Sequence, residues 1–183
     1  LGLYESSAMQ EEVFNAVRED EIRMIKEQFG AEVISYIYYP DQFIFSKTPL
    51  RTLEDFDGLK IRTHSTALGD LAAGLGASGQ FVAFSEVYTA LERGVLDAGV
   101  TGSTPAYSQK WYEVSKYIIG PLTSHPHVMV AMNQARWDEL PTNLQQILKE
   151  EAAKTQAENL RLVNGWDQEG VDLAVAEGME HIP

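Results

Sequence analysis

The first part of the chain shows two kinds of hydrophobic pattern, one typical of a helix and one typical of strands. Apolar residues recur every three or four positions over 11–29, which predicts an amphipathic helix, and Gly30 is suited to end it. The segments 31–39 and 42–47 are instead rich in β-branched and aromatic residues. They predict two short strands that are separated at Pro40.

The rest of the chain alternates short apolar strands with helices. Ser85 is placed to cap the helix "EVYTALERG", and "GSTPAYS" is typical of a turn. A longer helix begins at Pro141 and runs into the 160s, where Gly165 and Gly170 weaken it. Further strands are expected at 59–63, 78–83, 96–101, 117–120 and 127–133. This alternation predicts an α/β fold with largely parallel strands.

One strand in this series carries two cations. In "GLKIR", Leu59 and Ile61 alternate with Lys60 and Arg62, so a period of two sends the aliphatic side chains to one face and the cations to the other. Arg62 is therefore either a solvated strand residue or a positive group held for an anion. Parity alone leaves both interpretations open.

Composition limits the kinds of partner. The formal net charge of -13 argues against nucleic acid and against electrostatic docking on anionic membranes. If the ligand is an anion, the positive charge that attracts it must be local, because the global field repels it. The chain contains no cysteine, which excludes disulfides, thiolate metal sites and cysteine nucleophiles.

Both ends of the sequence look like cuts in a longer protein. The chain opens with "LGLYESSAMQEE", without a basic residue or an initiator Met, and it stops at "AEGMEHIP". No apolar stretch is long enough to span a bilayer, and no signal peptide is present. We therefore expect an internal piece of a longer chain.

Three segments in order carry a resemblance to a known family. They are "TLEDFDGLKIR", then "FVAFSEVYTALERGVLDA", then "QKWYEVSKYI" with "RWDELPTNLQQILKEEA" further on. With them the chain resembles the solute-binding proteins of tripartite ATP-independent periplasmic (TRAP) transporters, the dicarboxylate-binding-protein-like family, over nearly its whole length. The resemblance implies an α/β, periplasmic-binding-protein-like (type II-like) architecture, in which two lobes flank a ligand cleft and a long helix braces both.

The resemblance also implies where the lobes begin and end. Residues 1–40 would form part of lobe I, 41–127 would form lobe II with the ligand clamp, 128–167 would return to lobe I with the long helix from about 141, and 168–183 would start a return to lobe II. The first βα units of the family have no counterpart in this sequence, so lobe I is expected to be incomplete.

Two residues match the ligand-binding positions of the family. Arg62 matches the arginine that grips the ligand carboxylate, and a guanidinium offers a charged planar fork that fits a carboxylate. Phe84 matches an aromatic residue that packs against the carbon skeleton of the ligand, although an aromatic side chain just before a helix can also pack on its first turns. The resemblance gives Lys60 no ligand role, and we expect it to be solvated.

Three further residues are candidates for the same cleft. Thr101 falls where many members have an asparagine, and "DAGVTGSTPAY" departs from their D-G-Q-E-N-P-type motif. This departure favours a less polar monocarboxylate over a sugar acid or a short dicarboxylate. Tyr107 could face the cleft, and His64 shares the strand parity of Arg62.

No motif supports a metal site or catalysis. "HPH" places His125 and His127 on one strand face, but no third ligand follows at a suitable spacing, so we expect neither a metal nor another cofactor. The sequence also lacks a G-x-S-x-G elbow, a P-loop and a Rossmann fingerprint.

The sequence therefore predicts a periplasmic binding protein that captures a small organic acid for the permease subunits of a TRAP transporter, without chemistry on the ligand. Two alternatives stay open. One is an esterase-like hydrolase on a truncated binding-protein scaffold. The other is a non-binding piece that forms a homodimer through the exposed surface of the incomplete lobe. We expect neither nucleic-acid binding nor direct membrane insertion.

Overall fold

The computed structural model describes residues 7–123 and 127–183, and these divide into two compact units. Of the described residues, unit 1 contains 40–123 and 166–183, and unit 2 contains 7–39 and 127–165. The assignment of these units to the two expected lobes stays a prediction.

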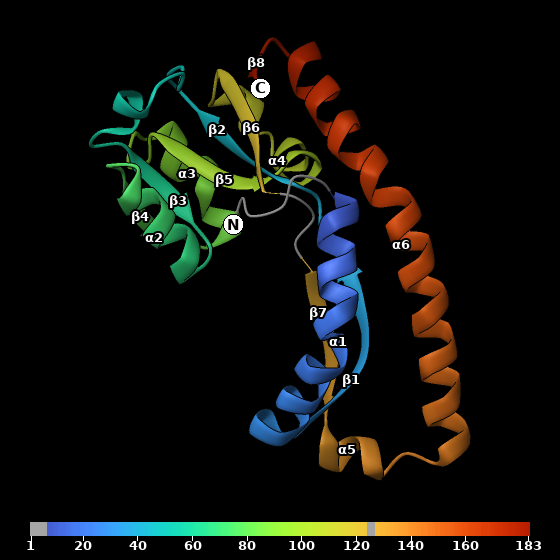
Figure 1. Cartoon of the computed structure of the whole chain (residues 1–183). Helices are drawn as coiled ribbons and strands as arrows, with labels where there is room; N and C mark the ends of the chain where they lie inside the picture. The colour runs from blue at the N-terminus through green and yellow to red at the C-terminus, as the bar shows by residue number, and fades with distance from the viewer. Residues whose placement is uncertain (1–6, 124–126) are drawn as a thin grey trace. The chain divides into compact units, whose positions relative to one another are not determined.

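Unit 1 is built on a six-stranded sheet with the order β4-β3-β5-β2-β6-β8 (Figure 1). Its strands are β2 (Gln42–Ser46), β3 (Lys60–Thr63), β4 (Ser78–Phe81), β5 (Ala98–Gly102), β6 (Tyr117–Thr123) and β8 (Glu180–Ile182). β3 runs parallel to β4 and β5, and β8 runs parallel to β6, but β2 is antiparallel to both of its neighbours. Five of the six strands therefore run in one direction, as the expectation of largely parallel strands requires, and β2 alone runs against them. Every residue of β2 is buried, and a strand buried on both faces has the same apolar pattern in either direction.

Helices cover both faces of this sheet. On one face, Leu68 and Ala72 of α2 pack with Ile61 and Val100. On the other face, side chains of α3, α4 and α6 pack around Trp111, which is completely buried. The helices are α2 (Thr66–Gly74), α3 (Val87–Glu92), α4 (Ser103–Ser108) and α6 (Thr142–Ala176), and short 3-10 turns are η1 (Leu53–Phe56), η2 (Phe84–Glu86) and η3 (Trp111–Glu113).

Two short segments of unit 1 differ from the expected pattern. The stretch "STPAYS" forms the helix α4 rather than a turn, because Ala106 is buried in the core with Trp111. Ser85 does not cap α3. It lies inside the 3-10 turn η2, and Glu86 occupies the N-cap position of α3 without a side-chain bond.

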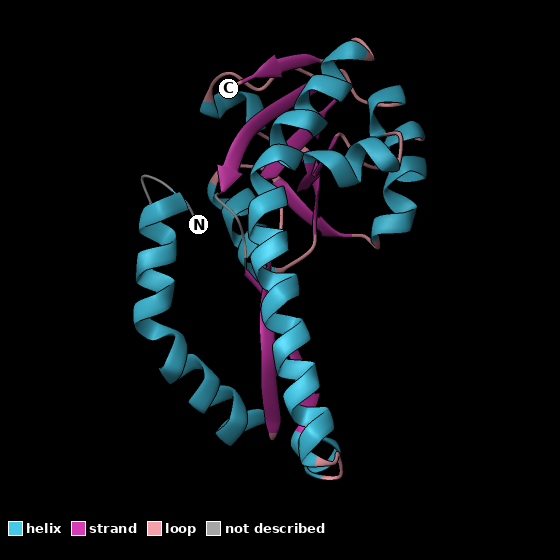
Figure 2. Ribbon diagram, turned by 90° about the vertical axis from the view of Figure 1, so that its right-hand side faces the viewer, coloured by secondary structure: helices cyan, strands magenta, loops and turns pink. Residues whose placement is uncertain are grey.

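The long helix α6 continues to Ala176, beyond the end expected in the 160s (Figure 2). Each interior glycine costs a helix about 1 kcal/mol relative to alanine. Val171 and Ala174 are buried in the core of unit 1, and this packing outweighs the weak propensity at Gly165 and Gly170. Among the helices of the described ranges, none is both long and apolar enough to cross a membrane.

Unit 2 joins α1 (Ser7–Phe29) to an antiparallel pair of strands, β1 (Ala31–Tyr38) and β7 (His127–Asn133), which α5 (Gln134–Asp138) and the first part of α6 follow. The hydroxyl of Tyr38 donates to Glu11 on α1 (2.8 Å). The amide of Asn159 on α6 accepts the backbone N–H of Tyr38 (2.6 Å) and donates to its carbonyl (3.1 Å). Side chains from two helices therefore satisfy polar groups of β1.

Candidate functional site

Arg62 lies on β3 and is only 6% exposed, although it is charged. Its Nε donates to the carbonyl of Val82 (3.0 Å), and its Nη1 donates to the carbonyl of Val100 (2.8 Å). These two bonds fix the plane of the guanidinium. The structure therefore excludes the interpretation of Arg62 as a solvated strand residue, whereas Lys60 is exposed as expected.

Phe84 contacts Arg62 from the turn η2. The centre of its ring lies 5.8 Å from Cζ of Arg62, within the range of a cation–π interaction, and 5.7 Å from the ring of Trp111. Trp111 is itself packed edge-on against Phe45 at 5.6 Å. The aromatic core of unit 1 therefore reaches the guanidinium through Phe84, which is half-buried.

His64 follows the end of β3 and bonds to a buried glutamine. Its Nε2 lies 3.0 Å from Oε1 of Gln42, and Nε2 of Gln42 donates to the carbonyl of Pro40 (3.1 Å). Partial burial of the imidazole and the nearby positive charge of Arg62 lower the pKa of His64. The neutral form of His64 therefore predominates at neutral pH.

Thr101 lies on β5, and its side chain is buried. Gly99 is the register partner of Arg62, and residues two apart in a strand share a face, so Thr101 lies on the same face of the sheet as Arg62. Arg62, His64 and Thr101 thus gather where the parallel strands β3 and β5 end, with Phe84 just beyond the end of β4. Ligands of α/β sheets commonly bind at this carboxyl edge.

Tyr107 has different neighbours. Its ring stacks on Tyr112 with 5.1 Å between centres, and its hydroxyl points to Oε1 of Glu177 at 3.5 Å. Among the contacts of the described residues, none joins Tyr107 to Arg62 or Phe84. A ligand role for Tyr107 stays a prediction without support from the geometry.

Of the two histidines considered for a metal site, His125 lies outside the described residues. His127 stacks on Phe14 within unit 2, with 3.9 Å between ring centres. In the part of the chain that the structure describes, no three histidine or acidic side chains form a group suited to a metal ion.

Two histidines of unit 1 bond to groups other than serine. His64 contacts Gln42, and Nε2 of His181 lies 3.0 Å from the carbonyl of Gly120. The hydroxyl of Ser65 accepts the backbone N–H of Leu68 and caps α2. Nε2 of each histidine therefore contacts an amide or a backbone carbonyl and not a serine hydroxyl.

Sequence reasoning missed Gln42 and the two carbonyls that hold Arg62. A glutamine at the start of the otherwise apolar segment "QFIFS" was a visible signal, since a polar side chain in a buried strand needs partners. Backbone carbonyls carry no sequence signal. Their role at Val82 and Val100 emerges only when three strands are brought together.

The sequence pattern of the bacterial extracellular solute-binding protein family 7 matches residues 4–183. The chain belongs to this family. It is the family of TRAP solute-binding proteins that the motifs around Arg62 and Phe84 predicted, and that prediction is confirmed.

Named relatives of the chain agree with the family assignment. The 2,3-diketo-L-gulonate-binding periplasmic protein YiaO of Escherichia coli (strain K12) is 33% identical over 140 residues, which cover 75% of this chain and 42% of YiaO. The C4-dicarboxylate-binding periplasmic protein DctP of Rhodobacter capsulatus is 31% identical over 159 residues, which cover 84% of this chain and 46% of that protein. The chain therefore spans about half the length of the curated relatives it matches.

A solved structure confirms the α/β fold class. The crystal structure of DctP7, a Bordetella pertussis extracytoplasmic solute receptor binding pyroglutamic acid, matches with a TM-score of 0.93 and 25% identity. The match covers 100% of this chain and 60% of that chain.

Proposed function

We propose that this solute-binding protein captures a small organic acid and that Arg62 holds its carboxylate. The observation that carries the proposal is a buried guanidinium, oriented by two carbonyls, at the carboxyl edge of parallel strands. A guanidinium offers a carboxylate paired N–H donors, and partial burial strengthens such bonds. YiaO, DctP and DctP7 are each named for a carboxylic acid, which supports this ligand class.

The neighbours of Arg62 give the site its selectivity in this proposal. Phe84 presents an aromatic face to the carbon skeleton of the ligand while it packs on Trp111. The Thr101 hydroxyl and the neutral imidazole of His64 add polar contacts without adding charge. Because the chain as a whole carries a charge of -13, the local positive charge of Arg62 is what selects an anion.

The proposal also includes a cellular setting. The protein binds its acid in the periplasm and delivers it, without chemical change, to the permease subunits of a TRAP transporter. Support comes from the family, which is described as extracellular, and from YiaO and DctP, which are named as periplasmic proteins.

The proposal also includes a homodimer of the chain. Large apolar side chains of α1, including Val17 and Phe29, are exposed in unit 2, and a second copy of the chain would cover such a surface. Light scattering on the purified protein tests the homodimer separately. A measured mass equal to that of a single chain would contradict it.

Thermal unfolding in the presence of a panel of carboxylic acids tests the binding function. A ligand at one hundred times its dissociation constant stabilises the folded state by about 2.7 kcal/mol, which raises the melting temperature measurably. The response should vanish in Arg62→Met and persist in Lys60→Met, because Lys60 is an exposed cation on the same strand. An equal rise of the melting temperature in the Arg62→Met variant would show that Arg62 does not bind the ligand.

The esterase-like alternative has less support. His64 and His181 contact Gln42 and the carbonyl of Gly120, and the Ser65 hydroxyl is used as a helix cap. Hydrolysis of an ester by pure protein, lost on a single serine substitution, would favour this alternative.

A further inference from the structure

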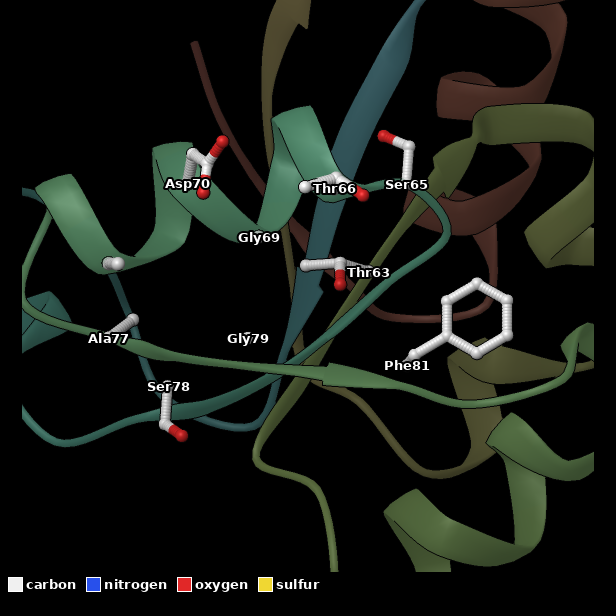
Figure 3. Close-up of a pocket in the computed structure, with 10 residues that line it drawn as sticks. Thr63, Ser65, Thr66, Gly69, Asp70, Ala77, Ser78, Gly79 and Phe81 are labelled. Atoms are coloured by element: carbon white, nitrogen blue, oxygen red, sulfur yellow. The ribbon is translucent and has the colours of Figure 1, made fainter.

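A pocket of about 480 Å³ opens between α2 and the strands β3 and β4 of unit 1 (Figure 3). Thr63 lies in its wall, and Thr63 is the neighbour of Arg62 in β3, so the two side chains lie on opposite faces of the sheet. The pocket is therefore separate from the candidate carboxylate site. Its volume falls within the range of small-molecule sites.

Two glycines line this pocket. A Cβ on Gly79 of β4 would lie 3.0 Å from Cα of Gly69, so α2 and β4 approach backbone to backbone. A Cβ on Gly69 of α2 would meet only Oγ1 of Thr63, at 4.0 Å. Position 69 therefore has space for a Cβ, next to the hydroxyl of Thr63.

The hydroxyl of Thr63 lies next to Gly69, 4.0 Å from the position of an added Cβ. Thr63 is 4% exposed, and it lines the pocket (Figure 3). A ligand hydroxyl that enters the pocket can therefore form a hydrogen bond with the side chain of Thr63.

The charges around the pocket favour a neutral ligand. None of the described residues that line it is a lysine or an arginine, which disfavours an anion. Thr66 is the first residue of α2, and the positive end of the helix dipole at this position disfavours a cation. Asp70 lines the pocket one turn later and supplies carboxylate oxygens that accept hydroxyl protons.

The remaining lining points to a polyhydroxylated ring. Ser65, Thr66 and Ser78 add hydroxyl groups, and Phe81 of the edge strand β4 is 80% exposed at the rim. An aromatic face beside hydrogen-bonding groups suits a ligand with one apolar face and several hydroxyls, since each surface then meets its complement.

We propose that this pocket binds a neutral sugar or cyclic polyol, with Thr63 and Asp70 bonding to its hydroxyls and Phe81 against its apolar face. This second site uses none of the residues assigned to carboxylate binding. It is therefore independent of the function proposed above.

Calorimetric titration of the full chain with a panel of neutral hexoses and cyclic polyols tests the second site. At least one member should bind saturably. Thr63→Val, which keeps the shape of the side chain and removes the hydroxyl, should weaken that binding by up to about tenfold, the loss expected for one hydrogen bond.

Two glycine variants of α2 form a matched pair. Gly69→Leu adds a bulky side chain at the pocket, where its Cβ would meet only Thr63 Oγ1 at 4.0 Å, and should abolish sugar binding. Gly74→Leu, at a position outside the pocket where an added Cβ has nothing within 4 Å, should leave sugar binding unchanged. Stabilisation by a carboxylic acid should persist in Gly69→Leu, so that the two sites are told apart. The proposal is overturned if no neutral sugar binds at millimolar concentration, if Gly69→Leu binds as well as wild type, or if only amines or anions bind.

Discussion

Gly170 of α6 lies directly against Ser103 at the start of α4. A Cβ at position 170 would overlap the Ser103 side chain and lie 2.5 Å from the backbone nitrogen of Thr104. The Ser103 hydroxyl donates to the carbonyl of Asp167 (3.1 Å), so a hydrogen bond accompanies the close approach. Gly170, which lowers the helix propensity of α6, is therefore the residue that allows α6 to pack on α4.

Gly170→Ala should destabilise the protein by roughly 1–3 kcal/mol, the usual cost of overpacking a filled site. Gly165→Ala is the matched control, because it lies in the same helix and a Cβ added there would have nothing within 4 Å. That substitution should stabilise by about 0.5–1 kcal/mol through helix propensity and the entropy of the unfolded chain. Urea unfolding measures both values. Equal effects of the two substitutions would show that the contact with Ser103 is not tight.

The elements of the fold were largely predictable, because their signals are local. The helical spacing of apolar residues over 11–29 and the glycine at position 30 predicted α1. Gly30 adopts the left-handed conformation, with φ of 58°. The end of α6, the helix α4 and the direction of β2 were not predictable. Each depends on packing partners that are distant in the sequence, such as Ser103 against Gly170.

The tyrosines of β1 should make the protein sensitive to alkali. Burial, together with Glu21 and Glu11 respectively, raises the pKa of Tyr36 and of Tyr38 from 10 to about 12. A group with a raised folded-state pKa stabilises fully below its unfolded pKa, so the free energy of unfolding should fall as the pH rises from 10 to 12.

The double variant Tyr36→Phe/Tyr38→Phe isolates that effect. It should be less stable at neutral pH, by about 1 kcal/mol for each lost hydrogen bond, and its stability should depend less on pH above 10. Chemical unfolding at several pH values gives both quantities. The same alkaline slope in wild type and variant would refute the assignment to these two side chains.

The pKa of His64 should depend on the charge of Arg62. Its pKa is lowered by partial burial and then by the positive charge of Arg62, so Arg62→Met should raise it. NMR titration of the imidazole measures the change, with Lys60→Met as the control that removes an exposed cation of the same strand. If both variants shift the His64 pKa equally, the attribution of the lowered pKa to the charge of Arg62 is wrong.

Phe84 and Tyr107 should differ in their effect on ligand binding. Phe84→Leu removes the aromatic face beside Arg62 and should weaken the binding of the acid by roughly threefold to tenfold. Tyr107→Phe removes only the hydroxyl near Glu177 and should leave affinity unchanged. Titration calorimetry on both variants makes the comparison, and a larger loss in Tyr107→Phe would reverse the two assignments.

The candidate site was predictable only where it depends on side-chain identity. Arg62 and Phe84 stand in specific motifs, and the structure brings them into contact. The partners that orient Arg62 are carbonyls of Val82 and Val100, and any residue type could supply them. Gln42 reaches His64 across 22 positions of sequence, which no local pattern reveals.

The most direct test of the central claim compares one carboxylic acid with its own carboxamide, in wild type and in Arg62→Met, by titration calorimetry. Loss of a buried charge pair costs about 2 kcal/mol or more, so wild type should bind the acid at least about thirtyfold more tightly than the amide. That preference should disappear in Arg62→Met. An undiminished preference for the acid in the variant would contradict the account, because the carboxylate would then be held elsewhere.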